Sequence, residues 1–334
     1  MQTNPASGSR RRVIFDTDPG IDDALALAFA LRCPELQVEA ITTVSGNVSV
    51  DLCTRNALLV LEALAVDNPP PVAQGADRPL TGEPVNASHV HGDDGLGGIT
   101  RITESDGAPR YPAPRRTACS RHAVELILEI VGSNPREITL IAVGPLTNVA
   151  LALERDPTTM RGLAALIVMG GSVSGIGNVT PTAEFNFYAD AEAARQVLRA
   201  GFRTTLVGLD VTERTLLPKE DLEQHLAGSK SPAARFVADI SRQYFAVAEA
   251  RRGHAACPLH DPLAVGVAID PTFVRTELFE ADVETEGALT TGMLIGDRRR
   301  VVPASGLPAR IEACVEVDVE RFLGVFLDRV LGAP

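Results

Sequence analysis

The sequence contains no tryptophan, and aromatic residues make up only 4% of its 334 residues. Hydrophobic residues nevertheless make up 45% of the chain, so a large core is available, but it must be built mainly from aliphatic side chains. Strands rich in Val, Ile and Leu are typical of parallel sheets, which are buried on both faces. The length fits one large α/β domain or two smaller ones.

Basic residues are also in deficit. The chain has 31 Lys and Arg against 43 Asp and Glu, which gives a formal net charge of -12. Nucleic acids and anionic membranes gain no attraction from an acidic protein surface, so we expect neither as a partner. The two dense basic clusters, at 10–12 and 298–300, are short and typical of solvated surface.

Signals for export, for membrane insertion and for disulfides are missing as well. The five cysteines are scattered and form no C-x-x-C pair, as expected of reduced thiols in a cytosolic protein. The first ten residues are polar, unlike a signal peptide, and no apolar run reaches the roughly 20 residues of a membrane span. We predict a cytoplasmic protein with a disordered tail at 1–11 and a single domain at 12–331.

Strand-like apolar runs alternate with helical patterns along most of the chain. The predicted strands are 13–15, 38–44, 138–143, 163–169, 204–209, 278–284 and 311–317. The predicted helices are 24–31, 50–65, one that opens at Pro145, 231–252 and one at the end of the chain. This alternation predicts an open, mostly parallel, doubly wound (Rossmann-like) sheet flanked by helices. The segment 104–116, rich in Pro, Gly and Arg, is expected to be the most mobile loop.

Four aspartates lie within eight residues at the end of the first predicted strand: Asp16, Asp18, Asp22 and Asp23. A turn at Pro19-Gly20 and a helix cap at Asp22 or Asp23 would be ordinary uses of these residue types. They would account for two of the four carboxylates. The others repel one another and need a cation or a shared proton. The cluster therefore predicts half of a site for a hard metal ion.

Other polar residues without an obvious structural role also follow predicted strands. They are Asn47, the segment 144–148, Asn178, Glu184, Asn186 and Asp210. In open α/β sheets, ligands bind at the carboxyl ends of the strands. We therefore expect these groups to converge on one crevice.

The segment PLHDPL at 258–263 is a second candidate site. The residue before a proline is pushed away from helical geometry, so Pro262 should open a helix with Asp261 as its N-cap. One carboxylate oxygen would then serve the cap and the other a metal ion, with His260 beside the site as a proton donor. The capping and metal-binding interpretations are compatible.

Two glycine-rich loops have weaker signals. His89 and His91, on one face of a short strand, have a spacing that can suit zinc, but no third nitrogen or sulfur ligand lies nearby, and the aspartates favour an oxygen-loving ion. The loop 170–178 is neither a Walker A sequence nor a dinucleotide-binding motif. It is expected to be a surface loop, or one that folds over a small polar ligand.

Seven motifs, in this order, resemble those of the inosine–uridine-type nucleoside hydrolases: DTDPGIDDA (16–24), ITTVSGN (41–47), HG (91–92), GPLTN (144–148), VMGG (168–171), EFN (184–186) and HDPLA (260–264). The first motif is highly specific, and the ordered set spans nearly the whole chain. The resemblance implies a nucleoside hydrolase-like fold. It also implies hydrolysis of the N-glycosidic bond of ribonucleosides, which gives free base and ribose.

The resemblance further implies a Ca²⁺ ion held by Asp18, Asp23, Asp261 and the backbone carbonyl of Val143. If Asp23 binds through both oxygens, two ribose hydroxyls and one water would bring the ligand count to about eight, which Ca²⁺ accepts and Mg²⁺ does not. Asp18 would also act as general base for the water, and Asp16 would support the cluster from behind. His260 would be the general acid for the departing base.

Substrate contacts are implied for a further set of residues: Asp22 and Asn47 at the ribose 2′ side, Asn178, Glu184 and Asn186 at the 3′ and 5′ hydroxyls, Met169 packing nearby, His91 in the base pocket, and Tyr244 closing over it. The motifs contain no Arg or Lys to pair a phosphate, which favours nucleosides over nucleotides. The preference for purine or pyrimidine is left open. The family suggests a homodimer or a homotetramer.

Two other functions stay open at this point. The pair Asp16 and Asp18 after a strand is similar to the motif of haloacid-dehalogenase-type phosphatases, although there the second Asp is followed by x-Thr or x-Val and here by Pro-Gly. A non-catalytic, Ca²⁺-dependent nucleoside or sugar binder would keep every ligand but would not need His260. Fold alone excludes neither function.

Overall fold

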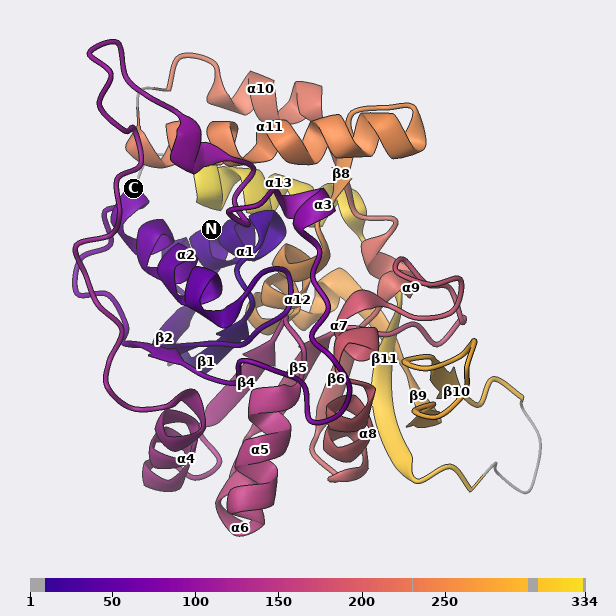
Figure 1. Cartoon of the computed structure of the whole chain (residues 1–334). Helices are drawn as coiled ribbons and strands as arrows, with labels where there is room; N and C mark the ends of the chain where they lie inside the picture. The colour runs from indigo at the N-terminus through magenta and orange to yellow at the C-terminus, as the bar shows by residue number, and fades with distance from the viewer. Residues whose placement is uncertain (1–9, 230, 300–305, 333–334) are drawn as a thin grey trace, which may run out of the picture.

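The computed structural model describes residues 10–229, 231–299 and 306–332. Its centre is a nine-stranded sheet with the order β10-β9-β11-β6-β5-β4-β1-β2-β3 (Figure 1). The strands of this sheet are β1 (Arg11–Thr17), β2 (Leu36–Thr43), β3 (Val72–Gln74), β4 (Ile138–Ala142), β5 (Ala165–Met169), β6 (Thr204–Val207), β9 (Val274–Val283), β10 (Leu294–Gly296) and β11 (Ala309–Val317). A small separate ribbon pairs β7 (Leu216–Pro218) with β8 (Ala256–Pro258).

Within the nine-stranded sheet, the seven neighbouring strands β11-β6-β5-β4-β1-β2-β3 are parallel. At the other edge, β9 pairs antiparallel with both β11 and β10. The chain builds β1, β2 and β3 in one direction, then returns to place β4 on the other side of β1. Strand order therefore reverses between β1 and β4. In a doubly wound sheet this reversal opens a crevice at the carboxyl ends of the strands. The predicted fold class is confirmed.

Helices cover both faces of the sheet (Figure 1). They are α1 (Ile21–Arg32), α2 (Val50–Ala63), α3 (Ser88–His91), α4 (Ala123–Ser133), α5 (Thr147–Arg155), α6 (Pro157–Met160), α7 (Phe185–Ala189), α8 (Ala191–Arg199), α9 (Leu209–Thr212), α10 (Lys219–Leu226), α11 (Pro232–Arg252), α12 (His260–Ile269) and α13 (Val319–Leu331), with 3₁₀ turns η1 (Ile99–Arg101) and η2 (Pro271–Phe273). One buried cluster joins the sheet to α1, α2, α11, α12 and α13, and another joins it to α4, α5 and α8. Both are mainly aliphatic, as the composition predicts.

Several sequence-based details are corrected. The first helix begins at Ile21 rather than Ala24, so Asp22 and Asp23 lie in its first turn and Gly20 is the N-cap. His89 and His91 lie on the one-turn helix α3 and not on a strand. Residues 1–9 of the predicted tail lie outside the described residues, while Arg11 already belongs to β1.

The segment 104–116, expected to be the most mobile loop, is hydrogen-bonded to two helices. Arg110 and Tyr111 bond the buried carboxylate of Asp239 on α11, at 3.0 and 2.8 Å. Further along, the backbone N–H groups of Arg115 and Arg116 donate to Glu62 of α2. Buried charge-assisted hydrogen bonds of this kind are the stronger ones in proteins. The segment therefore forms part of the outer wall beside α11.

Among the described residues, no helix combines the length and the apolar character needed to cross a membrane. The five cysteines are all free, and four of them are buried.

Candidate active site

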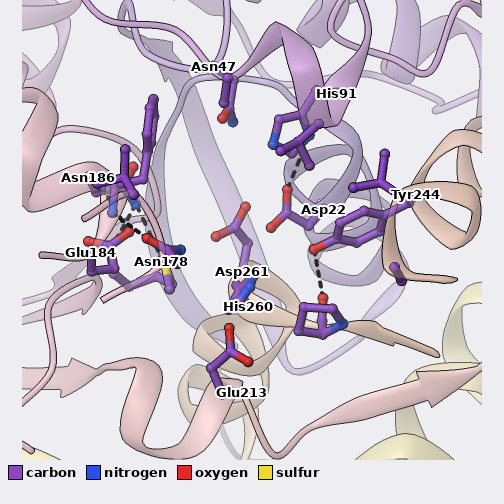
Figure 2. A pocket seen from close by; sticks show the side chains of 18 of the residues that line it. Asp22, Asn47, His91, Asn178, Glu184, Asn186, Glu213, Tyr244, His260 and Asp261 are labelled. Carbon is purple, nitrogen blue, oxygen red and sulfur yellow. Dashed lines mark hydrogen bonds and ion pairs between the residues drawn. The ribbon is translucent and has the colours of Figure 1, made fainter. Parts of the chain in front are cut away.

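A cavity of about 460 Å³ opens beside the point where strand order reverses. Its size lies in the range of about 300–1,000 Å³ that is typical of small-molecule sites. Figure 2 shows Asn178, Glu184 and Asn186 on one wall, Asp22, His91 and Tyr244 on the other, and His260 and Asp261 between them. Asn47, Val143 and Met169 also line the cavity. The predicted contact residues are thus brought together from eight separate segments of the chain.

Asp23 secures the start of α1. Its two carboxylate oxygens accept from the Thr17 hydroxyl at 2.5 Å, the Gly20 N–H at 2.9 Å and the Asn47 amide at 3.0 Å. This combination is a helix cap in which a side chain inside the first turn reaches back to the N-cap backbone. Asp23 therefore caps the helix from its third position and not as the N-cap residue, and these hydrogen bonds fix its carboxylate for any further role.

Asp18 is fully buried and is not among the residues that line the cavity. Its Oδ2 accepts the Asn47 N–H at 2.7 Å, but its Oδ1 has no hydrogen-bond partner among the described residues. A Cβ built on Gly46 or Gly144 would collide with this carboxylate, so both glycines are required for the close approach of the backbone. A buried oxygen without a partner is costly. Oδ1 is therefore poised for a ligand that the protein itself does not supply.

Asp22, Asp23 and Asp261 form a compact carboxylate cluster, with one oxygen from each lying within 4.8 Å of the others. Burial raises the pKa of Asp18 and of Asp261 well above the ordinary value, and repulsion from neighbouring carboxylates raises it further. Burial also raises the pKa of Asp22, although the nearby His260 opposes the shift, and burial together with repulsion from Asp22 raises the pKa of Asp23. Buried oxygen donors that repel one another suit a hard divalent cation. The residues present therefore fit a metal ion.

The wall formed by Asn178, Glu184 and Asn186 is held by its own hydrogen bonds. Glu184 caps α7 by accepting from the N–H groups of Asn186 and Phe187, and burial raises its pKa to about 7. Asn186 donates its amide N–H to the Val143 carbonyl at 2.7 Å. That carbonyl, the predicted backbone ligand, keeps a second lone pair. The wall thus presents amide and carboxylate oxygens in fixed positions.

His91 and Tyr244 form the opposite wall, with ring centroids 6.2 Å apart. His91 Nδ1 accepts the Ile21 N–H at 3.0 Å, so its proton lies on Nε2. Burial lowers the pKa of His91 to about 4, so the 3.8 Å approach of Nδ1 to Asp22 is not an ion pair at neutral pH. Tyr244 donates its hydroxyl to the Pro258 carbonyl at 2.9 Å.

His260 and Asp261 begin α12, whose N-cap is Leu259. The expectation that Asp261 is the N-cap is therefore wrong: it lies inside the first turn, and the carboxylate is free to join the cluster. His260 Nδ1 lies 2.8 Å from the Thr212 hydroxyl. Burial lowers the pKa of His260, and the nearby Asp22 opposes this shift.

Several predicted polar groups do not line the cavity, among them Asp16, Asp18, Asp23, Asn148 and Asp210. Asn148 and Thr42 both donate to Asp16 Oδ1 behind the cluster, at 2.8 and 2.5 Å. Burial raises the pKa of Asp16 to about 7. Asp210 instead holds the glycine-rich loop, since it accepts from the N–H groups of Val173 and Ser174 at 2.9 Å.

Sequence reasoning missed two residues of α9 and the turn that follows it. Thr212 bonds His260, and Glu213 lines the cavity while paired with Arg252 at 2.7 Å. Arg251 also lines the cavity. The signal was present, because both missed residues follow β6, as the predicted polar groups follow other strands.

The cavity brings buried carboxylates and histidines together over the carboxyl ends of a doubly wound sheet, where open α/β proteins bind their ligands. The comparisons with known proteins identify the class as the nucleoside hydrolases, which are N-glycosyl hydrolases. The sequence model of the inosine-uridine preferring nucleoside hydrolase family matches residues 13–324, and the chain belongs to this family. It is 37% identical over 328 residues to the inosine-uridine preferring nucleoside hydrolase of Crithidia fasciculata, covering 97% of this chain and 99% of the relative. It is 36% identical over 319 residues to the pyrimidine-specific ribonucleoside hydrolase RihA of Citrobacter koseri, covering 95% and 97%.

The fold agrees with solved structures of this class. A plant nucleoside hydrolase, the PpNRh1 enzyme, superposes with a TM-score of 0.88 at 34% identity and covers 97% of this chain and 99% of its own. The resemblance based on motifs is therefore confirmed at the level of the family and of the fold.

Proposed function

We propose that the protein hydrolyses the N-glycosidic bond of ribonucleosides, releasing free base and ribose, with Ca²⁺ bound at the carboxylate cluster. The observation that carries this proposal is the buried cluster of Asp22, Asp23 and Asp261, two of which line the same cavity as His260. The buried Asp18 adds an oxygen, Oδ1, that has no hydrogen-bond partner among the described residues. Carboxylates this close need a counter-charge. A metal ion supplies it permanently, and an electron-poor sugar supplies it in the transition state.

The ligands of the ion would be Asp18, Asp23, Asp261 and the Val143 carbonyl. All are oxygen donors, which suit the hard cations Ca²⁺ and Mg²⁺ better than they suit softer metals. Of these two ions, Ca²⁺ accepts the higher number of ligands. Asp22, which we assign to the ribose 2′ side, forms the compact carboxylate group with Asp23 and Asp261, whereas Asp18 lies outside that group. When bound, the cation makes its water more acidic and holds the sugar diol in place.

Asp18 serves as the general base. Its partner-free Oδ1 and raised pKa equip it to accept a proton from the attacking water. Asn47 fixes the other oxygen, so the carboxylate cannot turn away. Asp16 supports the strand end from behind through its bonds to Thr42 and Asn148.

Cleavage of the glycosidic bond passes through an oxocarbenium-like sugar. Oxygens of Asn178, Glu184 and Asn186 at one wall, and of Asp22 and Asn47 near the other, bind the hydroxyls and stabilise the developing positive charge. His260 donates a proton to the departing base, while His91, Met169 and Tyr244 pack around the substrate.

Nucleosides are preferred over nucleotides. The wall with Asn178, Glu184 and Asn186 has no cation among its described lining residues to pair a phosphate. The arginines of the lining, Arg251 and Arg252, come from α11 together with Tyr244, on the side assigned to the base. Relatives are named for inosine and uridine or for pyrimidines, so we propose a purine or a pyrimidine riboside without choosing between them.

Chromatography of a nucleoside panel tests the proposal. Incubation with the protein and Ca²⁺ should yield free base and ribose in equal amounts. Intact nucleoside after prolonged incubation, combined with saturable binding, would instead indicate a non-catalytic binder. Release of phosphate from phosphate esters would support the phosphatase alternative.

Assembly and location are part of the same proposal. We expect a homodimer or homotetramer, which sedimentation equilibrium would check; a monomer at all concentrations would refute it. The five free cysteines support a cytoplasmic location. Recovery of the native protein outside the cytoplasm on cell fractionation would refute that.

A further inference from the structure

His260 reaches the cavity from the first turn of α12, and its ring is held by one contact on another element. Its Nδ1 lies 2.8 Å from the Thr212 hydroxyl at the end of α9. Thr212 is fully buried, whereas His260 lines the cavity. Figure 2 shows His260 at the floor of the cavity with Glu213, the neighbour of Thr212, beneath it. The two elements therefore meet directly at the imidazole.

The Thr212 hydroxyl bonds a side chain on another helix instead of the backbone of its own segment. Thr215 and Thr54 turn their hydroxyls back to the carbonyl four residues earlier, at 3.0 Å to Val211 and 2.8 Å to Val50. The backbone N–H of Thr212 bonds Gly208, but among the described residues its hydroxyl bonds only His260. A buried hydroxyl needs a partner, and here the partner is the imidazole.

We propose that Thr212 is the positioning residue for the leaving-group acid: it binds Nδ1 of His260 and so leaves Nε2 as the nitrogen that meets the departing base. The inference rests on the proposed function of His260 as general acid. A hydroxyl suits this task because it can donate to a bare Nδ1 or accept from Nδ1–H. The ring can therefore keep one orientation before and after it delivers its proton.

The alternative is that Thr212 only completes the packing of α9 against α12. Both roles predict some loss of activity when Thr212 is replaced, so the test needs a measurement that a change in packing alone would not affect. Nucleosides need a proton on the departing base, whereas the nitrophenolate of a nitrophenyl riboside leaves without one. The ratio of the rate on nucleosides to the rate on the nitrophenyl riboside therefore measures the contribution of the general acid.

The variants are Thr212→Val, which keeps the branched shape and removes the hydroxyl, and Thr212→Ser, which restores it. Thr215→Val is the matched control, because it removes an equally buried hydroxyl three residues away whose partner is a backbone carbonyl. Thr212→Val should lower kcat/KM for inosine and uridine roughly tenfold to a hundredfold, as misplacement of a catalytic group does. Turnover of the nitrophenyl riboside should change by less than about twofold.

Thr212→Ser should return the ratio of rates close to the parent value, and Thr215→Val should leave it unchanged. Equal losses on both substrates, or no loss on either, would overturn the inference. If His260→Ala shows the selective loss and Thr212→Val does not, only the role of Thr212 fails.

A spectroscopic measurement, which does not depend on turnover, tests the inference even if the parent protein releases no base. The ¹⁵N resonance of His260 Nδ1 should move in Thr212→Val but not in Thr212→Ser or Thr215→Val, because a hydrogen bond to that nitrogen is lost. An unmoved resonance would overturn the inference, whereas absence of base release from the parent protein would refute the proposed function alone.

Discussion

Replacing Asp18 by Asn should separate stability from function. The side chain is fully buried, Oδ1 has no partner, and burial and the neighbouring Asp23 raise the pKa. Asn has nearly the same shape and can still accept the Asn47 N–H, but it carries no charge. In the presence of a chelator, we expect Asp18→Asn to be more stable than the parent protein.

The magnitude follows from the buried oxygen that has no hydrogen-bond partner. Burial of such an oxygen costs roughly 1–3 kcal/mol, and more when it carries a charge. Removal of the charge should therefore stabilise the folded protein by roughly 1–3 kcal/mol at about pH 8, where the carboxyl ionises in the unfolded state. For a chain of this size that corresponds to a rise in Tm of a few degrees, on the order of 2–4 °C per kcal/mol.

The sign of the pH dependence is fixed as well. A carboxyl whose pKa is raised by folding contributes fully to the free energy of unfolding at pH values below its pKa in the unfolded chain, about 3.9. This contribution is lost as the pH rises through the pKa of the folded protein. The advantage of Asp18→Asn should therefore vanish near pH 4 and grow toward pH 8. Added Ca²⁺ should raise the Tm of the parent protein and have much less effect on the variant, because a ligand that binds only the folded state stabilises it.

Thermal denaturation with chelator or with Ca²⁺, across this pH range, is the assay. Asp67→Asn serves as the control, since Asp67 is exposed and belongs to no carboxylate cluster. A variant less stable than the parent at high pH in chelator would refute the reasoning. An equal Ca²⁺-dependent rise in Tm for both proteins would refute the role of Asp18 as a ligand.

Three further predictions concern catalysis and stability. His260→Ala should lower nucleoside turnover by roughly a hundredfold or more, with little effect on a nitrophenyl riboside; an equal loss on both would remove the general-acid role. Asp239→Ala should destabilise the fold by about 3 kcal/mol, because it strips the buried partner from Arg110 and Tyr111, and it should speed proteolysis within 104–116; unchanged denaturation and proteolysis would contradict the tether. Inosine should be turned over far faster than its 5′-monophosphate, and comparable rates would contradict the assignment of the cation-free wall to the sugar.

Much of the fold was predictable, because strands buried on both faces leave long aliphatic runs in the sequence. The predicted helix at 231–252 corresponds to α11, which differs by one residue at its start. Helix starts were harder to place: Ile21 and His260 begin their helices without a side-chain cap at the preceding residue. A rule that looks for Asp or Ser at the N-cap therefore started α12 two residues too late, at Pro262 instead of His260.

The candidate site was predictable to the extent that its residues follow strands or match family motifs. Asp22 and Asp261 fit this description, and both line the cavity. Thr212 and Glu213 also follow a strand, β6, but they match none of the family motifs. Their contacts with His260 of α12 and Arg252 of α11 arise only in the folded chain. Asp210 shows the opposite error, since it follows a strand but bonds a neighbouring loop. Sequence order cannot tell which way such a side chain turns.

The most direct test of the account is base release from inosine and uridine by chelator-treated protein as Ca²⁺ is added back. The account predicts almost no release in chelator and a saturable return of free base and ribose with Ca²⁺, a return that Asp18→Asn should not show. Full activity in chelator, or intact nucleoside at every Ca²⁺ concentration, would contradict it.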